Sequence, residues 1–346
     1  MQKLFSRLRY PLIQAPMAGV QNEALTIAVC HAGVLGSLPA AMYSVEALDA
    51  ALTAIRAAVG DAPYNVNFFA HRPPVVSDAQ REAWHALLAP HLARFGLTVA
   101  DIPAAPGRRP FDADALAVVQ KHRPPVVSFH FGLPEAPLLQ AVRATGAKIL
   151  SSATSVAEAR WLAERGVDGI IVQGLEAGGH RGWFLHHDPN AQSGLFALLP
   201  SIRRAVSLPL IAAGGISDAA TVRAAMQLGA DAVQVGSAFL LADEATTSAT
   251  HRAALQSPRA EETVLTNLFS GGCARGIVND FMRAVGAINA AALPFPLAGA
   301  AAALLKKAAE GAGNYEYSAF WAGQNAILAR PGSAAEIVAR LAAGFS

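Results

Sequence analysis

The stretch LPLIAAGGISDAATVRAAMQLGADAVQVGS (residues 208–237) contains one complete unit of a pattern that runs along most of this chain. Its two short apolar runs, at 208–215 and 232–237, are typical of parallel strands that are covered on both faces. The amphipathic segment 219–228 between them predicts a helix, and Gly229 directly after it is a common helix stop. This stretch therefore predicts a strand, a helix and a second, parallel strand.

Six further apolar runs of the same kind precede this stretch. They lie at residues 12–16, 33–38, 64–69, 125–132, 148–153 and 169–174. Helical segments such as 156–165 separate most of them. Eight strands in alternation with helices predict an α/β fold, a (β/α)8 TIM barrel. The alternative is an open doubly wound sheet, which usually has fewer strands.

The chain changes character after the eighth run. From Asp243 to Gln324 the sequence indicates only helices, with turns at 270–272 and 293–294. We expect a small helical subdomain, residues 243–324, inserted after the eighth strand and packed over the barrel mouth. Residues 1–242 and 325–346 would form the barrel, which a last helix at 334–343 completes.

The composition excludes several classes of protein. The 346 residues are 53% hydrophobic and 15% charged, with a formal net charge of +2 and no long basic run. We therefore expect a large core and neither a nucleic acid nor a membrane as partner. The longest apolar stretch, 290–305, is interrupted by prolines and is too short to span a bilayer. Two cysteines without disulfide or metal-ligand spacing, and no apolar signal segment, predict a cytoplasmic protein.

The seventh and eighth runs end in glycines where TIM barrels often hold a phosphate group. Gly214 and Gly215 end the seventh run, and Gly236 and Ser237 end the eighth. Glycine lets backbone N–H groups approach a phosphate closely, and the N-terminus of the following helix adds a favourable dipole. Tight turns alone would explain one such pair, but two pairs at the expected positions favour a phosphate-bearing ligand.

Soft or polar side chains stand near the ends of three other runs. These are Met17, Asn67 and Gln173. A buried amide needs hydrogen-bond partners, and the edge of a flavin ring offers several. The alternative is that these amides are satisfied within the barrel core.

Two histidines are candidates for chemistry at the barrel mouth. His180 follows Gly178 and Gly179 in the loop after the sixth run, where an imidazole can take a proton from a carbon acid or hydrogen-bond an oxyanion. The alternative is a histidine on a surface loop. His130 alternates with two phenylalanines, so it points into the mouth if they pack under the helices. A satisfied core histidine is the alternative there.

Other barrel chemistries find little support in the sequence. A Schiff-base aldolase needs a lysine at the carboxyl end of a strand, but Lys148 begins its run. The strand ends supply almost none of the histidines and carboxylates that a metal site needs. Cys273, the candidate nucleophile, lies in the helical region. Flavin chemistry remains, because there the cofactor carries the reactivity and the protein positions it.

Five motifs at the predicted strand ends occur together in this chain. They are QAPMAG (14–19), SFHFG (128–132), EAGGHRG (176–182), AGGI (213–216) and QVGS (234–237). As a set they resemble the nitronate monooxygenases, formerly called 2-nitropropane dioxygenases. With WAGQ (321–324), the resemblance covers nearly the whole chain.

The resemblance implies that the barrel binds FMN non-covalently and that there is no metal. The residues that would bind FMN are Ala15, Pro16, Met17, Asn67, Gln173, Ala177, Gly178, Gly179, Gly214, Gly215, Gln234, Val235, Gly236 and Ser237. His180 would be the catalytic base or the nitronate-binding group, and His130 would bind substrate. The implied substrates are O2 and a small nitronate or nitroalkane, such as an alkyl nitronate or propionate 3-nitronate. The implied role is detoxification, and a homodimer is compatible with it.

One segment departs from the family pattern. In SGGCARG (270–276), Cys273 stands where the family has proline, which bears on the shape of the pocket. Tyr315, Tyr317 and Phe320 are the candidates for side chains that narrow the pocket.

Two other functions fit a flavin-binding barrel. An FMN-dependent enoyl-[acyl-carrier-protein] reductase shares the barrel and a similar loop, but it would need NAD(P)H, and no nucleotide fingerprint is visible. A non-catalytic flavin-binding protein would not need an ionisable group such as His180 beside its cofactor.

Overall fold

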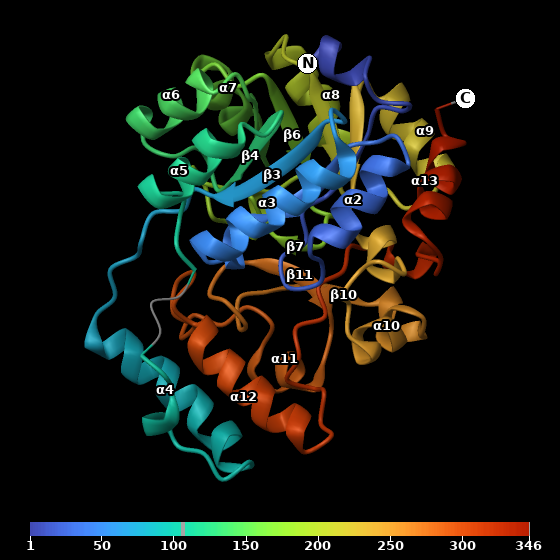
Figure 1. The fold of residues 1–346 in the computed structure, drawn as a ribbon. Helices are drawn as coiled ribbons and strands as arrows, with labels where there is room; N and C mark the ends of the chain where they lie inside the picture. The colour runs from blue at the N-terminus through green and yellow to red at the C-terminus, as the bar shows by residue number, and fades with distance from the viewer. Residues whose placement is uncertain (105–107, 346) are drawn as a thin grey trace.

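Eight parallel strands form one sheet in the computed structural model, which describes residues 1–104 and 108–345 (Figure 1). Their order in space is β1, β9, β8, β6, β5, β4, β3 and β2, and a parallel bridge between Ile13 and Leu35 joins the two ends of the sheet. The sheet therefore closes, and the predicted (β/α)8 TIM barrel is confirmed. The strands are β1 (Leu12–Gln14), β2 (Gly36–Pro39), β3 (Tyr64–Phe69), β4 (Val126–His130), β5 (Lys148–Ala153), β6 (Gly169–Gln173), β8 (Leu210–Ala213) and β9 (Ala232–Val235).

A ring of helices covers the outside of the barrel. It consists of α2 (Glu23–His31), α3 (Val45–Val59), α5 (Ala113–His122), α6 (Ala136–Ala144), α7 (Val156–Glu164), α8 (Leu195–Ala205), α9 (Ala219–Gln227) and α13 (Ala334–Ala342). Several begin at a polar side chain that accepts a backbone N–H, such as Ser44 for α3 and Asp218 for α9. The main hydrophobic cluster fills the space between this ring and the outward faces of the strands.

A smaller cluster fills the interior of the barrel. Ile13, Val126, Ile171 and Ile211 come from the strands, in alternation with residues that face the helices. Leu4 of α1 (Gln2–Phe5) packs into the same cluster. Helix α1 therefore closes the amino-terminal end of the barrel and leaves the carboxyl-terminal end for a ligand.

A second layer covers the carboxyl-terminal end. It contains α4 (Asp78–Ala93), α10 (Ala249–Leu255), α11 (Asp280–Val285) and α12 (Gly299–Gly311). Trp84 of α4 shares a hydrophobic cluster with Phe281 of α11 and Leu305 of α12, and Figure 1 shows α4 beside α12. The cover is thus drawn from two segments, one between β3 and β4 and one after β9.

The helical interpretation of residues 243–324 is wrong at two places. β10 (Thr263–Thr266) and β11 (Ala274–Ile277) form an antiparallel three-stranded sheet with β7 (Gly179–His180). Strands this short are too brief to show a hydrophobic period. Their pairing also depends on β7, which precedes β8 in the chain, so no local pattern could indicate it.

Short 3-10 helices connect several elements. They are η1 (Ala40–Met42), η2 (Val99–Asp101), η3 (Pro189–Ala191), η4 (Ser237–Leu241), η5 (Pro258–Glu261) and η6 (Ala326–Leu328). Within the described residues, no helix combines the length and the apolar character that crossing a membrane requires. The domain limits at 243 and 324 stay a proposal, and residues 105–107 and 346 of the proposed barrel lie outside the described residues.

Candidate active site

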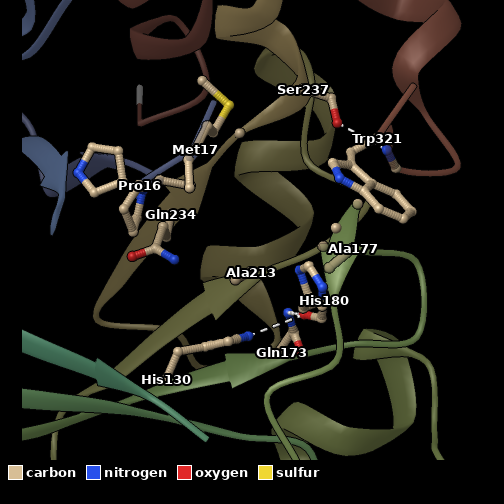
Figure 2. A pocket seen from close by; sticks show the side chains of 18 of the residues that line it. Pro16, Met17, His130, Gln173, Ala177, His180, Ala213, Gln234, Ser237 and Trp321 are labelled. Atoms are coloured by element: carbon tan, nitrogen blue, oxygen red, sulfur yellow. Dashed lines mark hydrogen bonds between the residues drawn. The ribbon is translucent and has the colours of Figure 1, made fainter. Parts of the chain in front are cut away.

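A pocket opens at the carboxyl ends of the barrel strands, where Figure 2 shows its wall. With one exception, every residue that the sequence placed at the site lines this pocket. They are His130, His180, Ala15, Pro16, Met17, Asn67, Gln173, Ala177, Gly178, Gly179, Gly214, Gly215, Gln234, Gly236 and Ser237. Val235 is the exception: its side chain is buried among the helices, because it alternates with Gln234 and Gly236, and its carbonyl accepts the N–H of Ala15. The side chain of Val235 therefore does not line the pocket, and a contact between Val235 and the cofactor stays a prediction.

The loop that carries His180 is held by strand pairing and by glycine. Strand β7 pairs with β11 of the cover. Gly179 has a φ of +69°, in the left-handed region that favours glycine. A Cβ on Gly178 would lie 2.6 Å from the carbonyl carbon of Ala322, so only glycine fits there. His180 Nε2 lies 2.8 Å from Oγ of Ser270, which fixes the orientation of the ring.

His130 and Gln173 bind the backbone of the same loop. His130 Nε2 lies 3.1 Å from the carbonyl oxygen of His180, and Nδ1 lies 3.0 Å from Oγ of Ser152. Because a carbonyl can only accept, Nε2 carries the proton and Nδ1 accepts from the serine. Gln173 donates to the same carbonyl at 2.9 Å and accepts from the N–H of Gly182 at 2.7 Å. Both side chains line the pocket, but they use their polar atoms to position His180.

Arg181 is fully buried behind this loop. It donates to the carbonyl oxygens of Gly174 at 2.9 Å and Gly179 at 3.2 Å, and also to that of Ala177. Burial lowers the pKa of Arg181 to about 9, which leaves it protonated at neutral pH. It therefore contributes a fixed positive charge close to His180.

The histidines of the pocket are neutral at neutral pH. Burial holds the pKa of His180 well below its usual value, and the positive charge of Arg108 lowers it further. Burial likewise lowers the pKa of His130 to about 4. Nδ1 of His180 makes no hydrogen bond to any described residue. His180 thus offers the site a neutral imidazole with a free ring nitrogen.

The glycine turns after β8 and β9 also line the pocket, and the turn after β8 packs against the loop that carries His180. Gly214 and Gly215 have φ values of +116° and +68°, so the turn after β8 requires glycine for its own conformation. Asn325 donates to the carbonyl of Gly215 at 2.6 Å, and Oγ of Ser237 accepts from the N–H of Gly323 at 2.9 Å. Tight turns and phosphate binding are compatible explanations of these glycines, because both turns line the same pocket.

Two buried polar atoms in the pocket wall lack a partner among the described residues, Oε1 of Gln234 and Nε2 of His251. Oε1 of Gln234 is buried and accepts no hydrogen bond within the described residues. Asn67, by contrast, donates to Oγ of Ser128 at 2.9 Å. Since buried polar atoms are almost always paired, Gln234 indicates that a ligand donor completes the site.

The structure also places residues in the pocket that sequence reasoning missed. Trp321 lines it, with its ring centroid 5.6 Å from that of His180. The candidates for this position, Tyr315, Tyr317 and Phe320, are wrong, because none of them lines the pocket. Tyr317 packs in the cover, and Phe320 faces away from its neighbour Trp321 to stack on His251 at 5.0 Å.

Arg108 is another missed residue in the pocket wall, and among the described lining residues it is the only permanent charge. Two adjacent arginines in a polar loop carry no signal in the sequence, because nothing local says which of them turns inward.

The rival barrel chemistries find no support in the geometry. Lys148 is at the amino-terminal end of β5, exposed, and paired with Asp168 at 2.7 Å. Cys273 is buried outside the pocket, and burial raises the pKa of its thiol to about 11, so it is a poor nucleophile. No group of metal-ligating side chains gathers in the part of the chain that the structure describes.

Comparisons with known proteins agree with these features. A family model described as nitronate monooxygenase matches residues 1–344. A nitronate monooxygenase of Paraburkholderia phytofirmans is 42% identical over 342 residues, which cover 96% of this chain and 91% of that protein. A nitroalkane oxidase from Streptomyces ansochromogenes is 36% identical with a TM-score of 0.88, over 98% of this chain and 96% of that one. FabK from Thermotoga maritima, 24% identical with a TM-score of 0.73 over 99% and 94% of the chains, shows the fold alone. The extent of the family match and the identity to its members show that this chain belongs to the nitronate monooxygenase family.

Proposed function

We propose that this protein oxidises alkyl nitronates with O2, with FMN as its cofactor and His180 as its catalytic base or nitronate-binding group. One observation carries the proposal: a neutral imidazole, oriented by Ser270, stands in the wall of a pocket that the glycine turns after β8 and β9 also line. The family and the likeness to a nitroalkane oxidase support the same reaction.

The residues of the pocket fit FMN. The turns at Gly214–Gly215 and Gly236–Ser237 would receive the phosphate through backbone N–H groups. Gln234 would pair its free Oε1 with a donor on the ring edge, beside Pro16 and Met17. When bound, FMN would supply the redox chemistry, by taking electrons from the substrate and passing them to O2.

The protein itself would bind and orient the substrate. Nδ1 of His180 is the ring nitrogen left for a ligand, so it would hydrogen-bond a nitronate oxygen, or accept the α-proton of a neutral nitroalkane. The rings of Phe69, Phe295 and Trp321 surround this imidazole, with centroids at 6.4, 5.3 and 5.6 Å. These rings would exclude water from the reacting atoms. A site of this kind suits a small, partly apolar anion.

The visible spectrum of the purified protein, followed by O2 uptake with ethyl nitronate in the absence of NADH, tests the proposal. Flavin bands with NADH-independent uptake are the expected result. Flavin bands with activity only on NAD(P)H and an enoyl thioester would show an enoyl-[acyl-carrier-protein] reductase instead. Flavin without any turnover would show a flavin-binding protein, and a colourless protein that FMN cannot reconstitute would overturn all three.

A detoxifying role in the cytoplasm completes the proposal. Cys30 and Cys273 are both free and buried, and free thiols are typical of a reducing compartment.

A further inference from the structure

Arg108 gives the pocket a single, fixed positive charge. Among the described residues that line the pocket it is the only Lys or Arg, and no Asp or Glu lines it. Its guanidinium lies over the rings of Phe69 and Phe295, 5.9 Å from each centroid. The backbone at this position is anchored as well, because the carbonyl oxygen of Arg108 accepts from Nε2 of His71 at 3.1 Å.

This charge has no counter-ion among the residues that the structure describes. Within the described residues, the guanidinium of Arg108 forms no ion pair and donates no hydrogen bond, whereas its neighbour Arg109 pairs with Asp112 at 2.5 Å and Asp114 at 3.0 Å. Burial lowers the pKa of Arg108, although an arginine stays protonated. A half-buried cation without an anion is costly, and aromatic faces offset only part of that cost. An anionic ligand group would complete this part of the pocket.

The position of Arg108 indicates which anion that is. The glycine turns for the phosphate follow β8 and β9. In the closed barrel, β8 lies opposite β3, and strands β1 and β2 separate β9 from β3. Arg108 lies against Phe69, the last residue of β3, and against Phe295, and both of these rings are neighbours of His180. The charge is therefore at the substrate side of the pocket, away from the phosphate turns.

We propose that Arg108 is the specificity-determining residue of the substrate pocket. Its guanidinium binds the anionic nitronate beside His180, so the pocket favours a nitronate over the neutral nitroalkane of the same size. This inference rests on the proposed function. A nitronate shares its negative charge between two oxygens, and a guanidinium can donate two parallel N–H bonds to such a pair. The same charge also favours the neutral form of His180, which is the form that can share a hydrogen bond with the bound anion.

The test compares Arg108→Met with Arg109→Met in the FMN-loaded protein. Methionine keeps an unbranched side chain at this position and removes the charge. Arg109 is the control, because it is an exposed arginine next in sequence. We expect Arg108→Met to raise KM for ethyl nitronate at least about tenfold, as the loss of a charged hydrogen-bonding pair does. Inhibition by neutral nitroethane should change less than twofold, and the flavin spectrum should stay the same. Arg109→Met should match the wild type in all three measurements.

A second variant keeps the test decisive if Arg108→Met folds poorly. Arg108→Lys retains the charge but not the paired donors, so its KM for ethyl nitronate should lie between those of the wild type and Arg108→Met. An unchanged KM in both Arg108 variants, with an active wild type, would overturn the inference and leave the proposed function intact. Loss of FMN from these variants would overturn it too, because it would place Arg108 at the cofactor. A wild type that oxidises no nitronate would overturn both.

Discussion

His180 combines properties that are seldom found together on a surface histidine. Its ring is oriented by Ser270, its carbonyl receives hydrogen bonds from both His130 and Gln173, and its pKa is held well below the usual value by burial. Such a residue is poised to share or accept a proton without carrying a charge of its own. Its neighbours therefore explain its position better than its own sequence context does.

Replacement of this imidazole tests its role directly. We expect His180→Asn to keep FMN and to lose most nitronate turnover, by a factor of about 10² or more, because general acid–base groups contribute on this scale. Turnover is measured by O2 uptake and FMN content by the visible spectrum. His186→Asn, in the exposed loop that follows, is the control and should behave as the wild type. Wild-type turnover in His180→Asn would remove the residue from the mechanism.

At the scale of elements, the loop between β6 and β8 depends on one close backbone contact. Gly178 packs against the segment after Phe320, where a Cβ would lie 2.6 Å from both the carbonyl carbon of Ala322 and the nitrogen of Gly323. These are backbone atoms, so they cannot move aside as a flexible side chain would. The short β7 strand follows at once, and its pairing with β11 ties the loop to the cover.

A methyl group at Gly178 should therefore displace the whole loop. We expect Gly178→Ala to weaken FMN binding at least about tenfold, because the misplaced loop no longer lines the pocket, and to lower the thermal midpoint of unfolding by several degrees. Flavin fluorescence titration and thermal unfolding measure the two effects. Gly311→Ala is the matched control: it lies in α12 with open space around its Cβ position, so it should be neutral or slightly stabilising. Equal behaviour of the two variants would contradict this account.

The elements also show how far the sequence can predict this molecule. The strands of the barrel are visible because each is a buried apolar run, and the glycines after β8 and β9 mark the phosphate side. The strands β10 and β11 and the packing of α4 against α11 and α12 are not visible, because they depend on partners far along the chain. The same limit applies to single residues. Alternation along β9 places Gln234 in the pocket and Val235 outside it, but no alternation is available in the loops that carry Arg108 and Trp321.

At the scale of the whole molecule, the barrel and its cover enclose several histidines in neutral form. Burial lowers the pKa of both His130 and His251 to about 4. His251 stacks on Phe320 at 5.0 Å, and its Nε2 is buried without a partner in the described residues. In the unfolded chain these side chains would titrate near the usual value of about 6.5. The folded state is therefore less stable relative to the unfolded chain at any pH low enough to protonate these histidines in the unfolded chain.

The sign of this effect gives a prediction for the stability of the FMN-loaded protein. Between about pH 6.5 and pH 4 the unfolded chain binds more protons than the folded one, so the free energy of unfolding should fall as the pH falls. Each of these two histidines lowers the free energy of unfolding by up to about 3 kcal/mol between pH 7 and pH 4. Denaturant unfolding at pH 7, 5.5 and 4.5 measures the slope, and His251→Phe should make it shallower, because phenylalanine fills a similar space and binds no proton. His186→Phe, at an exposed position, should leave the slope unchanged. If His251→Phe keeps the wild-type slope, then the buried imidazole of His251 does not couple folding to pH.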